Sequence, residues 1–340
     1  MDVTELLAHA VGAGASDLHL AAGEVPTLRL DGELRRLDLP PLEAIDLREG
    51  LGRLLERAGQ SCPGTVQELD VALALPGLGR FRLNLYEQLN GPAACMRVIP
   101  SRIPRLSELG LEEVFRLIAR CSSGLVLVGG PTGSGKSTSL AALVDQLNRE
   151  RALHIITLED PIEMIHSGHR SLVSQREIGR HSRDFAQGLR SALRQDPDVI
   201  MIGELRDLDS IRLALHAAQT GHLVLATVHT RSAVGSIDRL VDVFAAEEKA
   251  LVRAMLAESL CAVVSQQLVK RIGGGRVAAR EVLVATPAVR NLVREGRLAQ
   301  LHSAMQGGAA AGMQTLDAGL QGLLAQGLIG PEHVQALRAG

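Results

Sequence analysis

A glycine-rich segment between a short apolar run and a helix-forming run constrains this chain more than any other feature. Residues 125–129 (LVLVG) have the apolar, β-branched bias of a buried strand, and residues 139–150 are typical of a helix. Between them, residues 130–137 (GPTGSGKS) match the G-x-x-x-x-G-K-S pattern of a phosphate-binding loop. A strand before and a helix after are the context that this loop requires, so the sequence predicts a nucleotide-binding α/β fold.

Each residue type in the loop has a chemical role in binding a nucleotide. Glycines let backbone N–H groups curl around the β-phosphate, and the N-terminus of the following helix adds positive potential. We expect Lys136 to reach the β- and γ-phosphates of ATP, and the Ser137 hydroxyl to ligate Mg²⁺. A glycine-rich turn with a solvated lysine is the ordinary alternative. The predicted nucleotide contacts are Gly130, Thr132, Gly133, Ser134, Gly135, Lys136, Ser137 and Thr138.

Carboxylates follow two further apolar strands. Residues 196–204 (DPDVIMIGE) end in Glu204, and ligands of open parallel sheets collect at the carboxyl ends of the strands. Glu204 is therefore the candidate to hold Mg²⁺, directly or through water. The acidic cluster at residues 159–163 (EDPIE) supplies Glu163 as the predicted base that orients and deprotonates the attacking water. Glu159 is the second candidate for that role and a predicted nucleotide contact.

Two histidines and three arginines complete the set of candidates. His222 and His229 bracket an apolar strand, where they could sense the γ-phosphate, bridge to a neighbouring subunit, or serve as hydrogen-bonded structural residues. Arg80, Arg82 and Arg97 lie on the last strands of the N-terminal region. Such residues can stabilise transition-state charge on phosphoryl oxygens, or they can be solvated on a strand face.

Composition excludes some functions. The 36 basic and 38 acidic residues nearly balance, and the chain has four Phe, one Tyr and no Trp. Both features argue against nucleic acid as a partner. The cysteines at 62, 95, 121 and 261 form no C-x-x-C pair, as in a reducing compartment. Without a signal-like N-terminus or a long apolar run, we expect a cytoplasmic protein that is recruited to a membrane by a partner.

The N-terminal part is expected to be a small α+β domain. Its predicted elements are a helix over 3–13, a strand over 16–20, a hairpin over 27–37, a helix over 44–58, and strands over 79–86 and 93–99. Pro100 and Pro104 then interrupt all periodicity, because proline fixes φ and removes a donor. We expect a linker at residues 100–108.

After the linker, short apolar strands alternate with helical segments, which predicts a parallel, three-layer α/β sheet. The expected strands cover 125–129, 154–158, 199–202 and 223–228. From about Lys249 onward the chain is expected to be mostly helical, with interruptions near 271–275 and 306–312.

Taken in this order, the motifs resemble the secretion-ATPase superfamily and, within it, the branch of type IV pilus retraction ATPases. The segments that carry the resemblance are ASDLHLAAGEVPTLRLDGELRRL, GPTGSGKST, TLEDPIE, DPDVIMIGELRD, TGHLVLATVHT and, at residues 288–295, AVRNLVRE. The resemblance covers roughly residues 3–325. Leu225 and Val289 are aliphatic where the family commonly has aromatic residues.

The resemblance implies a PAS-like domain (1–99), the linker, a RecA-like P-loop ATPase domain (109–285) and a helical C-terminal region (286–340). It implies a ring of six subunits with nucleotide at the interfaces, and a motor that couples ATP hydrolysis to pilus retraction and twitching motility. The implied partners are an inner-membrane platform protein and, indirectly, pilin, with a paralogous retraction ATPase as a further partner. The implied roles are metal coordination by Ser137 and Glu204, catalysis by Glu163, histidine-box functions, and arginines reaching the phosphates.

Other functions stay open at this point. An assembly or secretion ATPase typically adds a tetracysteine zinc element, which the scattered cysteines cannot form. The element at residues 288–295 counts against an accessory retraction-type paralogue without excluding it. A nucleotide-dependent scaffold with little turnover would not need a base beside its metal. If ATP closes one subunit on the next, residues 100–105 are the expected hinge.

Overall fold

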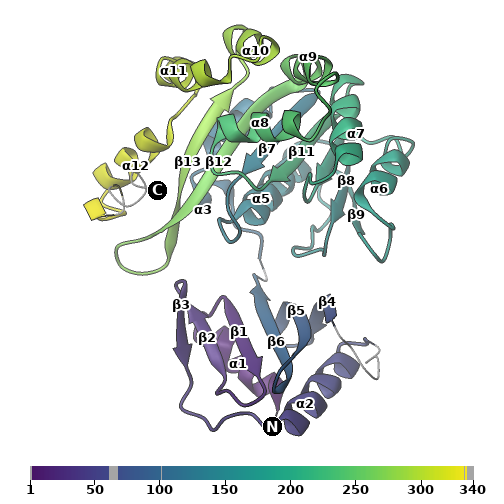
Figure 1. Cartoon of the computed structure of the whole chain (residues 1–340), viewed down its shortest axis with the longest axis vertical. Helices are drawn as coiled ribbons and strands as arrows, with labels where there is room; N and C mark the ends of the chain where they lie inside the picture. The colour runs from purple at the N-terminus through teal and green to yellow at the C-terminus, as the bar shows by residue number, and fades with distance from the viewer. Residues whose placement is uncertain (1, 61–67, 101, 333, 335–340) are drawn as a thin grey trace. The chain divides into compact units, whose positions relative to one another are not determined.

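The computed structural model describes the chain except for residues 1, 61–67, 101, 333 and 335–340 (Figure 1). Cys62 and position 101 of the predicted linker thus lie outside the described residues. Contacts divide the chain into two units. The first comprises Met1–Arg102 with Pro161–Met164, and the second comprises Ile103–Asp160 with Ile165–Gly340.

The first unit is an antiparallel sheet with two helices packed on each other and on its central strands β1 and β6. Among the described residues the strand order is β3-β2-β1-β6-β5-β4. Its elements are α1 (Val3–Gly12), β1 (Asp17–Ala21), β2 (Thr27–Leu30), β3 (Glu33–Arg36), α2 (Ala44–Arg57), β4 (Glu68–Leu75), β5 (Gly79–Gln88) and β6 (Gly91–Ile99).

Aliphatic residues from the helices and strands form the core of this unit. Leu7 of α1, Leu47 of α2 and Leu18 of β1 are fully buried together, as period-2 strand faces and helical stripes require. The expected helices, the hairpin and strands β1, β5 and β6 are confirmed. Strand β4 was not anticipated, and it pairs with β5 along its full length.

The second unit is built on a sheet whose order among the described residues is β13-β12-β7-β11-β10-β8-β9. The strands are β7 (Gly124–Gly129), β8 (His154–Glu159), β9 (Leu172–Glu177), β10 (Val199–Ile202), β11 (Leu223–Val228), β12 (Leu260–Lys270) and β13 (Arg276–Val284). The α-helices are α3 (Leu106–Leu109), α4 (Glu112–Ile118), α5 (Lys136–Glu150), α6 (Phe185–Ala192), α7 (Leu208–Gln219), α8 (Ala233–Asp242), α9 (Lys249–Ser259), α10 (Pro287–Arg294), α11 (Leu301–Gln306) and α12 (Leu316–Ala325).

Both faces of this sheet are covered, which confirms the expected three layers. Leu125 and Leu127 of β7 pack in one core with residues of α6 to α10. Val126 points into the other core, which α3, α4 and α5 cover. A strand buried on both faces must be apolar at every position, and this explains the continuous apolar run before the phosphate loop.

The expectation of a mostly helical chain after Lys249 is wrong. Helix α9 begins at Lys249, but the chain after α9 forms the long hairpin of β12 and β13 (Figure 1). Strand β12 joins β7 in parallel, whereas β13 is antiparallel, so the sheet is not wholly parallel. An apolar run buried on both faces lacks a strand's alternation, so periodicity could not separate it from a buried helix. The glycines at 273–275 form the hairpin turn. Strand β9 was also not anticipated.

The described part of the C-terminal region contains α10, α11 and α12 with the short 3₁₀ helices η1 (Leu298–Gln300) and η2 (Ala309–Ala311). Helix α10 begins after the cap Thr286 with Pro287 in its first turn. Val289 and Val293, one turn apart, are fully buried in the core. At the expected linker, residues 106–108 belong to helix α3. None of the helices in the described part of the chain is long and apolar enough to cross a bilayer.

Candidate nucleotide-binding site

The phosphate loop lies at the carboxyl end of β7, where β7 ends at Gly129 and α5 begins at Lys136. Gly130 has a φ of +152°, a backbone conformation that residues other than glycine rarely adopt. A Cβ there would lie 2.5 Å from the backbone oxygen of Gln266. The close approach of this loop to β12 therefore requires glycine at its first position.

Lys136 is folded back onto its own loop. Its Nζ donates hydrogen bonds to the carbonyl oxygens of Gly130 (2.8 Å) and Pro131 (2.9 Å). Burial lowers the pKa of this lysine, and the negative charge of Glu204 opposes that shift. The Ser134 hydroxyl is buried, with no hydrogen-bond partner in the described structure. A buried cation and an unpaired buried hydroxyl on this loop fit a phosphate group.

Glu204 follows β10 at the same edge of the sheet. Its Oε1 accepts from Arg206 Nε at 2.6 Å and lies 3.3 Å from His229 Nε2. The Ser137 hydroxyl is exposed in the first turn of α5. A hydroxyl and a carboxylate are hard oxygen ligands of the kind that Mg²⁺ takes beside phosphate oxygens, so these residues fit the predicted metal.

His229 follows β11, which lies between β7 and β10. Its pKa is lowered chiefly by burial and then by the charge of Lys136, while Glu204 raises it. The lowered pKa favours the neutral form of His229. The sheet order thus brings a lysine, a carboxylate and a histidine, which follow three adjacent strands, to one edge.

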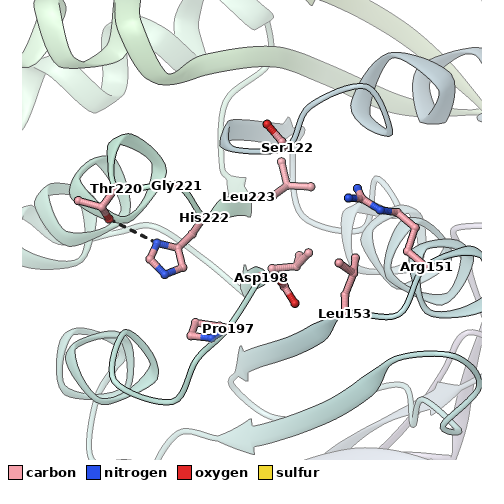
Figure 2. Close-up of a pocket in the computed structure, with 10 residues that line it drawn as sticks. Ser122, Arg151, Leu153, Pro197, Asp198, Thr220, Gly221, His222 and Leu223 are labelled. Carbon is pink, nitrogen blue, oxygen red and sulfur yellow. Dashed lines mark hydrogen bonds between the residues drawn. The ribbon is translucent and has the colours of Figure 1, made fainter.

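His222 lies at the other edge, at the amino end of β11. Its Nδ1 donates to the carbonyl oxygen of Ala217 (3.0 Å) and lies 3.3 Å from the Thr220 hydroxyl. It lines a polar cavity of about 130 Å³ with Arg151 and Asp198 (Figure 2). The prediction that both histidines could sense the γ-phosphate is therefore not supported for His222 within its own chain.

The acidic cluster is divided between the two units. Glu159 ends β8, and its Oε1 accepts from Thr157 Oγ1 (2.6 Å) and Gln175 Nε2 (3.1 Å). Glu163 belongs to the segment grouped with the first unit. Its carboxylate lies 3.8 Å from Arg82, and Arg80 donates to its backbone oxygen at 2.6 Å. The structure thus joins the predicted base to two of the three predicted arginines, Arg80 and Arg82.

The arginines of the first unit are held by protein groups. Arg82 makes two hydrogen bonds to Asp70, at 3.0 and 2.7 Å. Arg97 donates from Nε to Asp17 at 2.9 Å, and Asp17 is buried. Arg82 and Arg97 thus make specific ion pairs while their side chains stay partly exposed.

One residue that contacts the loop, Gln266, was not among the predicted site residues. Gln266 of β12 is 1% exposed, and its side chain is hydrogen-bonded to Ser134 and Ser139. It lies about 130 positions after the loop in the sequence, within a stretch expected to be helical. The signal that could have found it is the pair of glutamines at 266 and 267, inside an apolar run. A buried strand tolerates a side-chain amide only when that amide has hydrogen-bond partners.

A phosphate-binding loop between a strand and a helix, with a carboxylate at the end of a nearby parallel strand, defines a P-loop nucleotide-binding protein. The chain belongs to the family described as "Type II/IV secretion system protein", which matches residues 1–275.

Relatives span nearly the whole chain. It is 53% identical to the Pseudomonas aeruginosa protein described as "Type IV pilus retractation ATPase PilT", over 98% of this chain and 97% of that protein. It is 49% identical to a "Twitching motility protein" of Neisseria gonorrhoeae, over 90% and 82%. A solved structure described as "Crystal Structure of the Pilus Retraction Motor PilT and Bound ADP" matches with a TM-score of 0.83 and 41% identity, covering 98% and 96%.

Proposed function

We propose that this chain is the motor ATPase of type IV pilus retraction, an ATP hydrolase that powers pilus disassembly and twitching motility. The observation that carries the proposal is the convergence of Lys136, Glu204 and His229 at the carboxyl edge of the sheet, beside the phosphate loop. Full-length similarity to a retraction ATPase supports the choice of pilus retraction among the processes that such a site could drive.

Nucleotide binding would rearrange Lys136 first. Its two acceptors are neutral carbonyl oxygens, and phosphate oxygens are stronger acceptors because they are charged. If Lys136 exchanged the carbonyl oxygens for phosphate oxygens as its acceptors, binding of the β- and γ-phosphates would be favoured. Ser137 and Glu204 would hold Mg²⁺, which neutralises phosphate charge when bound. Glu163, with Glu159 as the second candidate, would orient and deprotonate the attacking water.

The first unit would act on the nucleotide of a neighbouring subunit. In this proposal it is a PAS-like domain (1–99), followed by a linker and hinge (100–108), a RecA-like domain (109–285) and a helical region (286–340). A homohexamer would place Arg80, Arg82 and Arg97 of one subunit at the phosphates of the next, where guanidinium groups stabilise developing charge. His222, outside its own phosphate site, would serve the contact between subunits.

The proposed partners are an inner-membrane platform protein, pilin through that platform, and a paralogous retraction ATPase, with no role for nucleic acid. The protein would work in the cytoplasm at the base of the pilus. An accessory retraction-type ATPase, an assembly or secretion ATPase and a low-turnover scaffold are the alternatives.

ATP turnover by the size-selected oligomer tests the proposal. We expect Lys136→Ala and Glu204→Gln to abolish turnover, because one removes the phosphate cation and the other a metal ligand. Glu247→Gln, at an exposed carboxylate before α9, is the matched control and should turn over normally. Binding without turnover in the unsubstituted protein would favour the scaffold. Normal turnover without normal retraction of pili in cells would favour the accessory or assembly function.

A further inference from the structure

Strand β12 continues past the point where its neighbour β7 ends. Ser265 is paired with Gly129, the last residue of β7, so Gln266 is the first residue of β12 that lies beside the phosphate loop instead of a strand. Its backbone oxygen determines how closely Gly130 can approach. The sheet register thus places this residue against the start of the loop.

The side chain of Gln266 reaches the other end of the loop. Its Nε2 donates to the Ser134 carbonyl oxygen at 2.7 Å, and its Oε1 accepts from the Ser139 hydroxyl at 2.9 Å. A carbonyl oxygen only accepts, so the amide nitrogen must face Ser134 and the amide oxygen is left for Ser139. Both ends of the buried amide are satisfied by one orientation.

This contact is independent of the phosphates, unlike the contact made by Lys136. The lysine now holds the loop through Gly130 and Pro131, and those bonds end when Nζ turns to a phosphate. Gln266 binds the backbone of the loop and the helix behind it, so its bonds persist with nucleotide present. Ser134 is 3% exposed, and its carbonyl group would otherwise lose a buried partner.

We propose that Gln266 is a positioning residue for ATP, which holds the phosphate loop in its binding conformation through Ser134 and Ser139 while Lys136 is engaged by phosphate. The inference rests on the proposed function, because it assigns a residue to the same nucleotide site. A loop that is already held in its binding conformation loses less conformational freedom when nucleotide binds, so its affinity for nucleotide is higher.

The test is nucleotide affinity in Gln266→Leu, measured by titration with fluorescent N-methylanthraniloyl-ADP and by the KM for ATP. Loss of two hydrogen bonds should raise both the Kd and the KM about tenfold, with a smaller change in kcat. Gln267→Leu is the matched control, since its side chain points to the opposite face of β12. It should bind like the unsubstituted protein.

Two further, more conservative variants distinguish a loss of loop positioning from a general loss of folding. Gln266→Glu keeps the size and the acceptor for Ser139 but cannot donate to Ser134, so it should lose affinity as well. Ser139→Ala should weaken binding about threefold, and should add nothing when combined with Gln266→Leu, because both remove the same bond.

Equal affinity in the Gln266 and Gln267 variants would overturn the inference. So would a Gln266→Leu variant with a lower melting temperature but unchanged Kd and KM, since that is the behaviour of a merely structural residue. ADP affinity is measurable in the absence of turnover, so an unsubstituted protein that binds but does not hydrolyse ATP would refute the proposed function alone.

Discussion

Replacing Gly130 by alanine tests the geometry of the phosphate loop most directly. The added Cβ would lie 2.3 Å from the Ser134 hydroxyl and 2.5 Å from the backbone oxygen of Gln266. The hydroxyl can rotate away, but the backbone oxygen belongs to a paired strand and cannot. Gly133→Ala is a matched control three residues later, where φ is +76° and no atom lies within 4 Å of the added Cβ.

The two substitutions should differ in cost. At Gly133 only the left-handed backbone opposes alanine, which costs about 1–2 kcal/mol. At Gly130 the backbone strain of about 1–3 kcal/mol is joined by about 1–3 kcal/mol of overpacking. We therefore expect Gly130→Ala to lower the free energy of unfolding by about 2–6 kcal/mol, a large part of the stability of an ordinary domain.

Urea unfolding followed by circular dichroism at 222 nm measures the difference, because a chain with no Trp gives little fluorescence signal. ADP affinity should fall in Gly130→Ala as well, since the loop must move away from β12 to admit the methyl group. Equal losses of stability in the two variants would show that contact with β12 does not restrain the loop, and the reasoning would then be wrong.

Three titrating groups give two further predictions. Burial lowers the pKa of His166 below 6.5, so as the pH falls below 6.5 the unfolded chain binds a proton that the folded chain does not, and stability should fall. Urea midpoints between pH 8 and pH 5 should therefore depend less on pH in His166→Gln, and identical slopes would count against this. A hydrogen bond with Cys261 lowers the pKa of Cys121 to about 7, whereas burial raises the pKa of Cys95. Iodoacetamide at pH 7.5 should thus alkylate Cys121 faster than Cys95, as mass spectrometry of peptides would show, and Cys261→Ala should slow the reaction at Cys121.

Much of the fold could be read from local patterns. The run at 125–129, the loop after it and the helix behind it were predictable, because each depends on residues that are neighbours in sequence. The hairpin of β12 and β13 was not, since the apolar run that opens β12 is buried on both faces and has no period to read. His222 shows a signal that was present but unused: the six residues of β11 separate it from His229, which makes seven steps of about 3.3 Å, or about 23 Å.

By itself, the sequence determined the chemistry of this protein: a phosphate loop ending in Lys136 and Ser137, and a carboxylate at the end of a buried strand. Glycine and lysine at fixed spacing carry that chemistry locally. Only the tertiary structure decided which residues share the site. The order of strands placed β11 between β7 and β10, and so put His229 beside Glu204. The register of β12 brought Gln266 to a loop far from it in sequence, because pairing between distant strands depends on how the whole sheet packs.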